Sequence, residues 1–145
     1  MTVKKIPDGY HTYTPYYVID GASDFIDFLT KAFGCKELFR MPMPGGRLGH
    51  AEVRVGDSVL MLADVMPPEV PARTMGGMFY VEDCDAVFAR AVAAGAKVSR
   101  PLANQFYGDR SGTVTDRWGN TWTIATHVED VSPEEMEQRM KAMKH

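Results

Sequence analysis

The segment Asp24-Phe25-Ile26-Asp27-Phe28-Leu29 opens a helical pattern that ends at Gly34. The chain repeats this pattern about sixty residues later, a period long enough for a whole supersecondary module. In the second copy, Asp85-Ala86-Val87-Phe88 opens the pattern and Gly95 ends it. Two strand-forming residues precede each copy, namely Tyr17-Val18 in the first and Tyr80-Val81 in the second. A small residue and a lysine follow each copy, namely Cys35-Lys36 and Ala96-Lys97. The sequence therefore predicts two copies of one module.

Both predicted helices have one apolar face. The first carries it on Phe25, Phe28, Leu29, Ala32 and Phe33, at the i, i+3, i+4, i+7 and i+8 spacing of an amphipathic helix. The second has a weaker stripe, and either Asp83 or Asp85 is its expected N-cap. Glycine is the expected C-terminal stop in both copies. Each helix is thus predicted to cover the face of a sheet.

After each helix the apolar pattern changes to a period of two, which is typical of strands. In the first copy this predicts strands over 36–41, 48–55 and 58–63, with a turn at 42–46 and a tight hairpin at 56–57. In the second it predicts strands over 96–99, 111–116 and 121–126, with a turn at 117–120. Three prolines, Pro67, Pro68 and Pro71, indicate a linker over 66–73. Each half is therefore predicted to be a strand, a helix and three strands.

A short helix is predicted at the end of the chain, over 132–144. Ser132 is its expected N-cap, Pro133 stands at the first helical position, and Glu135 completes a capping box. Met136, Met140 and Met143 then lie on one face. We expect this face to dock on its own domain or on a partner chain, while a methionine-lined ligand groove is the alternative.

Composition bounds the class of protein. The chain has 145 residues, a net charge of -3 and 45% hydrophobic residues, which is typical of one ordinary globular domain. No basic run favours nucleic acid, and no apolar stretch approaches the length of a membrane span or a signal peptide. We therefore expect a cytoplasmic protein with no nucleic-acid or membrane partner. Cys35 and Cys84 lack metal-ligand spacing, and we expect both to be reduced and structural.

Tandem βαβββ modules resemble the vicinal oxygen chelate superfamily, which includes glyoxalases, dioxygenases and bleomycin resistance proteins. The motifs are similar to its PhnB-like branch. They are Gly9-Tyr10-His11-Thr12-Tyr13-Thr14-Pro15-Tyr16, Gly49-His50-Ala51-Glu52-Val53, Gly56-Asp57-Ser58-Val59-Leu60-Met61-Leu62-Ala63-Asp64, Tyr80-Val81-Glu82-Asp83, Gln105-Phe106-Tyr107-Gly108-Asp109-Arg110 and Thr123-Ile124-Ala125-Thr126-His127.

The resemblance implies an α+β fold in which two curved mixed sheets surround a cavity, followed by the short C-terminal helix. It places module one at 10–65, the linker at 66–73 and module two at 74–128 within a single domain of 1–145. It also implies a homodimer.

Metalloenzymes of this superfamily take four ligands from the first and last strands of the two modules. Carried onto this chain, those positions are Tyr13, Leu60, Gly76 and Thr123. None is the histidine, glutamate or glutamine that such a site uses, so we expect no metal cofactor. The alternative is a divalent-metal enzyme of glyoxalase or dioxygenase type that takes non-standard ligands from among His11, His50, Glu52 and His127.

No dinucleotide, P-loop or serine-hydrolase motif is present in the sequence. The leading hypothesis is metal-independent binding or turnover of an unidentified small molecule, and whether the protein is an enzyme stays open. A structural dimer with a vestigial cavity is a third hypothesis. His50 and Glu52 also fit a solvated strand face, and Asp109-Arg110 also fits a surface turn. The candidate substrate-binding residues are Tyr13, His50, Glu52, Tyr107, Asp109, Arg110, Trp122 and Thr123.

Overall fold

The computed structural model describes residues 3–66 and 70–143. The chain divides into two compact units, unit 1 (Met1–Met75) and unit 2 (Gly76–His145), and each is described by itself. Each unit holds one βαβββ module, and unit 2 also carries the C-terminal helix. The predicted α+β fold class is therefore confirmed, whereas the cavity stays a prediction. Within the described ranges, no helix is long and apolar enough to cross a membrane.

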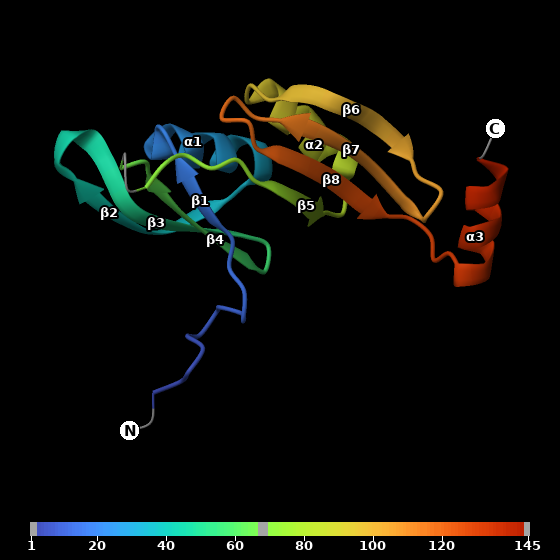
Figure 1. Cartoon of the computed structure of the whole chain (residues 1–145), viewed down its shortest axis with the longest axis horizontal. Helices are drawn as coiled ribbons and strands as arrows, with labels where there is room; N and C mark the ends of the chain where they lie inside the picture. The colour runs from blue at the N-terminus through green and yellow to red at the C-terminus, as the bar shows by residue number, and fades with distance from the viewer. Residues whose placement is uncertain (1–2, 67–69, 144–145) are drawn as a thin grey trace. The chain divides into compact units, whose positions relative to one another are not determined.

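Unit 1 is a four-stranded mixed sheet with one helix on one of its faces (Figure 1). The strand order is β1-β4-β3-β2, with β1 parallel to β4 and the other neighbours antiparallel. A short 3-10 turn, η1, joins β2 to β3. The elements are β1 (Tyr16–Ile19), α1 (Ala22–Phe33), β2 (Lys36–Met43), η1 (Pro44–Gly46), β3 (Arg47–Val55) and β4 (Ser58–Asp64).

Unit 2 repeats this topology with the strand order β5-β8-β7-β6, and β5 is parallel to β8. Its helix α2 contacts β7 and β8, while α3 follows the end of β8 (Figure 1). The elements are β5 (Gly76–Tyr80), α2 (Cys84–Ala93), β6 (Lys97–Asn104), β7 (Asp109–Thr115), β8 (Thr121–His127) and α3 (Pro133–Ala142).

The strands after each helix differ from their predicted bounds, and β2 and β6 run furthest past their predicted ends. β2 continues through Pro42 to Met43, and β6 continues through Pro101 to Asn104. Both lie at the edge of their sheet, where a proline is tolerated because its missing N–H costs no hydrogen bond within the ladder. The predicted turn at 42–46 is therefore too early, and only Pro44–Gly46 forms η1.

The helices are held on their sheets by burial and by caps that come from distant strands. Phe25 and Leu29 of α1 are completely buried, and each contributes about 2–3 kcal/mol by leaving water. The start of α1 has no cap from its own side chains, but Asp64 at the end of β4 accepts the N–H groups of Gly21 and Ala22, each at 3.0 Å. This cap was not predicted because Asp64 is more than forty residues from α1 in the sequence.

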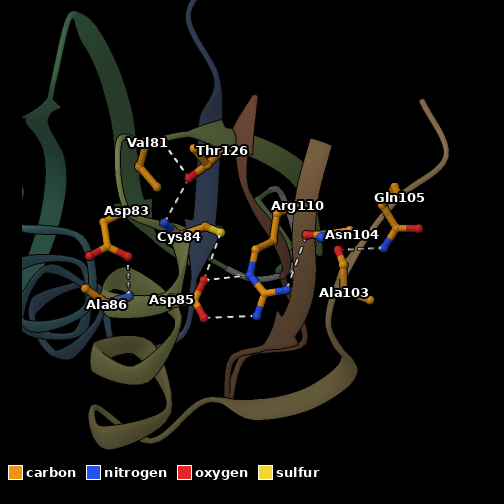
Figure 2. Close-up of polar contacts among 10 residues, drawn as sticks. All are labelled: Val81, Asp83, Cys84, Asp85, Ala86, Ala103, Asn104, Gln105, Arg110 and Thr126. Atoms are coloured by element: carbon orange, nitrogen blue, oxygen red, sulfur yellow. Dashed lines mark hydrogen bonds and ion pairs between the residues drawn. The ribbon is translucent and has the colours of Figure 1, made fainter. Parts of the chain in front are cut away.

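In α2, Asp83 is the N-cap, as one of the two predicted alternatives had it, and its carboxylate accepts the N–H of Ala86 at 3.1 Å. Thr126 at the end of β8 takes the place that Asp64 has in unit 1. Its hydroxyl accepts the N–H of Cys84 at 2.9 Å and donates to the carbonyl of Val81 (Figure 2). In both modules a side chain at the end of the last strand thus accepts an N–H at the start of the helix, and α2 has the local cap Asp83 in addition.

The connections at the ends of the modules are only partly described. In the linker, Met66 bridges Val70 and the N–H of Arg73 donates to Val18, whereas Pro67 and Pro68 lie outside the described residues. At the tail, the Ser132 hydroxyl accepts the N–H of Glu135 at 3.1 Å, which is half of the expected capping box. α3 ends at Ala142, and position 144 of the predicted helix is outside the described residues.

Candidate functional site

The face of the unit 1 sheet opposite α1, called the open face here, carries a row of four side chains that are neighbours across the strands. Glu52 of β3 pairs with Phe39 of β2 on one side and with Met61 of β4 on the other, and Met61 pairs with Tyr16 of β1. Partners in register point to the same face of a sheet. These four residues are called the unit 1 row.

A hydrogen-bonded cluster of four side chains occupies the middle of this face. His50 is two residues before Glu52 and on the same face, and its Nε2 lies 2.8 Å from Glu52 Oε2. His50 Nδ1 lies 2.9 Å from the hydroxyl of Tyr16, and the hydroxyl of Tyr10 donates to Glu52 Oε1. This Glu52 cluster comprises Tyr10, Tyr16, His50 and Glu52, and it engages both imidazole nitrogens and both carboxylate oxygens.

The cluster favours an ionised Glu52. Burial opposes the charge, but the hydrogen bonds from Tyr10 and His50 outweigh it and lower the pKa of the Glu52 carboxyl. Burial raises the pKa of Tyr16, and the nearby Glu52 charge adds to this against the opposite effect of Arg73. At neutral pH the face therefore presents a carboxylate that accepts from the Tyr10 hydroxyl and contacts the His50 ring.

Aromatic and sulfur-containing side chains surround the cluster. The ring of His50 lies 5.5 Å from that of Tyr16 and 6.1 Å from that of Phe39, both tilted. Phe39 and Met41 are 49% and 46% exposed. Large apolar side chains that stay half exposed around an organised polar centre are typical of a surface that binds organic ligands.

The open face of unit 2 has a matching row with different chemistry. Thr113 of β7 pairs with Arg100 of β6 and with Thr123 of β8, and Thr123 pairs with Met78 of β5. The hydroxyls of Thr113 and Thr123 lie 2.9 Å apart. The neighbouring Ser111, on the same face, is fully buried and accepts a 3.1 Å hydrogen bond from Arg100 Nη2. The four residues paired across the strands, without Ser111, are called the unit 2 row, namely Arg100, Thr113, Thr123 and Met78.

A second polar group lies at the end of this face. Asp109 is only 3% exposed, and its carboxylate accepts from the hydroxyl of Tyr80 and contacts His127 Nδ1, each at 2.8 Å. His127 Nε2 lies 2.8 Å from Asp130. The hydrogen bonds to Asp130 and Asp109 raise the pKa of His127. A neutral imidazole has one N–H and a charged one has two, so this arrangement favours the imidazolium.

Arg110 and Trp122, two predicted site residues, lie on the other face of the unit 2 sheet. Arg110 forms a two-bond fork with Asp85 in the first turn of α2, at 2.8 and 3.0 Å, and contacts Asn104 (Figure 2). This ion pair lowers the pKa of Asp85. Trp122 is 1% exposed, stacks on Phe79 and donates from its indole N–H to Asp116. The side chains of the adjacent residues Asp109 and Arg110 therefore lie on opposite faces of the sheet.

The remaining predicted residues are scattered. Tyr13 precedes β1 and is 75% exposed, and Tyr107 lies in the turn before β7 with its ring edge-on to Phe106. His11 is exposed in the segment before β1. The structure thus brings together His50 with Glu52, and Asp109 with His127.

Sequence reasoning missed Tyr10, Tyr16, Phe39 and Arg100. Strand register was the signal that could have found the last three, since each pairs with a row residue. Tyr10 lies in an irregular segment, and no sequence periodicity indicates its contact with β3.

The four positions that family metalloenzymes use do not form a set of metal donors here. Leu60 is buried on the α1 side of its strand, Tyr13 lies outside β1, and Thr123 bonds to Thr113. Gly76, the fourth position, has no side chain. Among residues 3–66 and 70–143, no group of three or more histidine, cysteine or acidic side chains is arranged to hold a metal ion. The residues present therefore do not fit a metal at the family's position.

Comparisons with known proteins agree on the fold. Residues 13–124 match the family model described as Glyoxalase/Bleomycin resistance protein/Dioxygenase superfamily. An uncharacterized protein of Mycobacterium bovis is 37% identical over 139 residues, which are 89% of this chain and 91% of that protein. The crystal structure of TioX from Micromonospora sp. ML1 is 27% identical, covers 82% of this chain and 98% of its own, and has a TM-score of 0.67. TnmS3, an antibiotic binding protein from Streptomyces sp. CB03234, is 23% identical, covers 86% and 99%, and has a TM-score of 0.65.

Proposed function

Since the chain belongs to the glyoxalase/bleomycin resistance protein/dioxygenase superfamily, we propose that it is a metal-independent protein that binds a small organic molecule on the open face of unit 1. The observation that carries this proposal is the Glu52 cluster with its exposed apolar surround. Membership of the PhnB-like branch is part of the same proposal, and the motifs quoted from the sequence support it.

The chemistry of this face favours a flat, largely apolar ligand with a hydrogen-bonding group near its middle. Phe39, Tyr16 and Met41 offer area and aromatic contacts. Each oxygen of Glu52 can accept one more hydrogen bond, so the carboxylate can orient a donor group of the ligand. TnmS3 is an example of an antibiotic-binding protein with this fold, and its likeness to this chain concerns the fold.

The same geometry disfavours the metal alternative. A histidine ligand binds through a free ring nitrogen, but Tyr16 and Glu52 engage both nitrogens of His50. Each oxygen of Glu52 also has a partner. Metal binding through His50 and Glu52 would have to break at least the hydrogen bond that joins them. A glyoxalase- or dioxygenase-type reaction at His50 and Glu52 is therefore the less favoured function.

Elemental analysis decides between the two functions. The protein is purified without a metal-affinity tag or chelator, and its metal content per chain is measured before and after dialysis and attempted reconstitution. We expect negligible zinc, nickel, manganese and iron. Near-stoichiometric metal that is lost in His50→Ala would overturn the proposal and support the metal enzyme.

Ligand binding is tested by an unbiased screen of aromatic small molecules, followed by thermal shift and calorimetry of the hits. Phe39→Ala should weaken a hit about tenfold or more, because a buried aromatic contact is lost. Leu38→Ala is the matched control, since Leu38 is the exposed neighbour that has no partner in the β2–β3 register. Hits that lose equal affinity in both variants would contradict the assignment of the site to this face.

A homodimer, which the family resemblance implies, belongs to the same proposal. The half-exposed Met140 of α3 and Met143, the C-cap of α3, are the expected contact for a partner chain. Sedimentation of the full chain and of a variant that lacks residues 133–145 measures it. A monomer in both cases would contradict dimerisation and leave the ligand site unaffected.

A further inference from the structure

The two open faces correspond position by position. Phe39 and Arg100 lie at equivalent places in β2 and β6, each one residue after a position that is bulged out of register. The other equivalent pairs in the rows are Glu52 with Thr113, Met61 with Thr123, and Tyr16 with Met78. Unit 1 therefore places a carboxylate among aromatic groups, whereas unit 2 places a guanidinium beside hydroxyls.

Arg100 is held in place by a group that does not neutralise it. Its Nη2 donates to the hydroxyl of Ser111, which is completely buried, so one edge of the guanidinium is fixed on the sheet. In the part of the chain that the structure describes, no carboxylate forms an ion pair with Arg100. Its neighbour across the ladder, Thr113, presents a hydroxyl. A fixed and unneutralised guanidinium is suited to binding an oxyanion.

We propose that the unit 2 row is a second binding site, which takes the carboxylate of an organic anion on Arg100. The planar fork of a guanidinium matches a carboxylate with two parallel hydrogen bonds, and the free edge of Arg100 supplies them. The hydroxyls of Thr113 and Thr123 add donors beside it. Met78, 45% exposed at the far end of the row, supplies apolar contact for the rest of the molecule.

The nearest charges on this face leave room for an anion. Asp109 is two residues from Ser111 on the same strand, but the Tyr80 hydroxyl and the His127 ring hold its carboxylate. The charge of Asp85 belongs to the opposite face, where Arg110 neutralises it. Among the described residues, the open face of unit 2 thus carries a carboxylate that is already bonded and a guanidinium that donates only to a neutral hydroxyl.

Benzoate is a suitable probe because it joins a planar carboxylate to one ring. Amide chemical shifts of Thr113 and Thr123 are followed during titration at constant ionic strength, with benzamide as the uncharged analogue. We expect saturable binding of benzoate, and at least about tenfold weaker binding of benzamide and of benzoate to Arg100→Gln, as for loss of a charge-assisted pair. Arg100→Lys, which keeps the charge without the fork, should be intermediate.

Arg110→Gln is the matched control, because Arg110 is a neighbouring arginine on the other face of the same sheet. It should bind benzoate within about twofold of the wild type, since a distant charge is screened by salt. Equal loss of affinity in Arg110→Gln and Arg100→Gln, equal binding to the wild type and Arg100→Gln, or no saturable binding to the wild type would each overturn the proposal.

Two further measurements keep the result interpretable. If Arg100→Gln unfolds, seen by circular dichroism, Arg100→Lys and Thr113→Val take its place, and unchanged affinity in both overturns the proposal. Inorganic phosphate in place of benzoate tests the alternative oxyanion, and tighter binding of phosphate than of benzoate overturns the assignment to an organic carboxylate. The two candidate sites share no residue, so the unit 1 proposal and this proposal can fail separately.

Discussion

At the scale of single residues, the pKa of Glu52 depends on which hydroxyl groups hydrogen-bond to its carboxylate. Tyr10 contacts the carboxylate directly, whereas Tyr16 contacts it only through His50. The two tyrosines therefore differ in their effect on the charge at the centre of the unit 1 face.

Tyr10→Phe should raise the pKa of Glu52, because the variant loses a hydrogen bond that favours the ionised carboxylate. Tyr16→Phe is the control and should have a smaller effect. The pKa is measured by following the side-chain carbon of Glu52 by NMR between pH 2 and 8. An equal shift in both variants would show that the hydroxyl of Tyr10 does not bond to Glu52.

His127 should make stability depend on pH at the alkaline end. Its folded-state pKa is raised above 6.5, first by Asp130 and then by Asp109, so its contribution is fully present below about pH 6.5. The contribution is lost as the pH rises through the folded-state pKa. Asp130→Asn should lower the pKa of His127, as measured by proton NMR. An imidazole that titrates at or below 6.5 in the wild type would contradict this arrangement.

At the scale of elements, the order of helices and strands could be predicted from the sequence, whereas the contacts between elements far apart in the sequence could not. The apolar stripe of α1 and the period-two strands follow from local spacing, so their order was correct. The extensions of β2 and β6 through Pro42 and Pro101 depend on edge position, which only the assembled sheet defines.

The candidate site was predictable to the same extent. His50 and Glu52 lie two apart on one strand, and local alternation places them on one face. Asp109 and Arg110 were predicted together, but adjacent strand residues point to opposite faces. Arg110 contacts Asp85, which is far away in the sequence, and this pairing depends on how α2 packs.

Asp64→Ala should destabilise the protein by about 2–4 kcal/mol, because backbone N–H groups at the start of α1 lose their acceptor. The carboxylate also accepts the N–H of Leu48 at 2.7 Å, so β3 is affected as well. Urea unfolding measures the change. Asp57→Ala, in the exposed turn between β3 and β4, is the control and should stay within about 0.5 kcal/mol.

At the scale of the whole molecule, each unit contains one buried thiol, Cys35 in unit 1 and Cys84 in unit 2. Burial raises the pKa of Cys35 to about 12. The thiolate is the reactive form, so Cys35 should stay unreactive, and Cys84 is only 2% exposed and out of reach of a reagent. We therefore expect neither thiol to react with a disulfide reagent at pH 8 in the folded state.

The single-cysteine variants Cys35→Ser and Cys84→Ser should then report the opening of unit 2 and unit 1 respectively, as reaction rates measured in increasing urea. Rapid stoichiometric labelling of either variant in the absence of urea would contradict the burial of its remaining thiol.

The correspondence of the two rows has a practical consequence for protein engineering. The side chains that fill the space beneath α1 and α2 point away from the open faces, so exchanging row positions leaves them in place. The buried Ser111 hydroxyl, which Arg100 contacts, is the exception. Each row is then a short set of positions that can be substituted while the sheet and its helix stay unchanged. Moving Phe39 chemistry to position 100, or arginine to position 39, would transplant a recognition surface between two copies of one sheet.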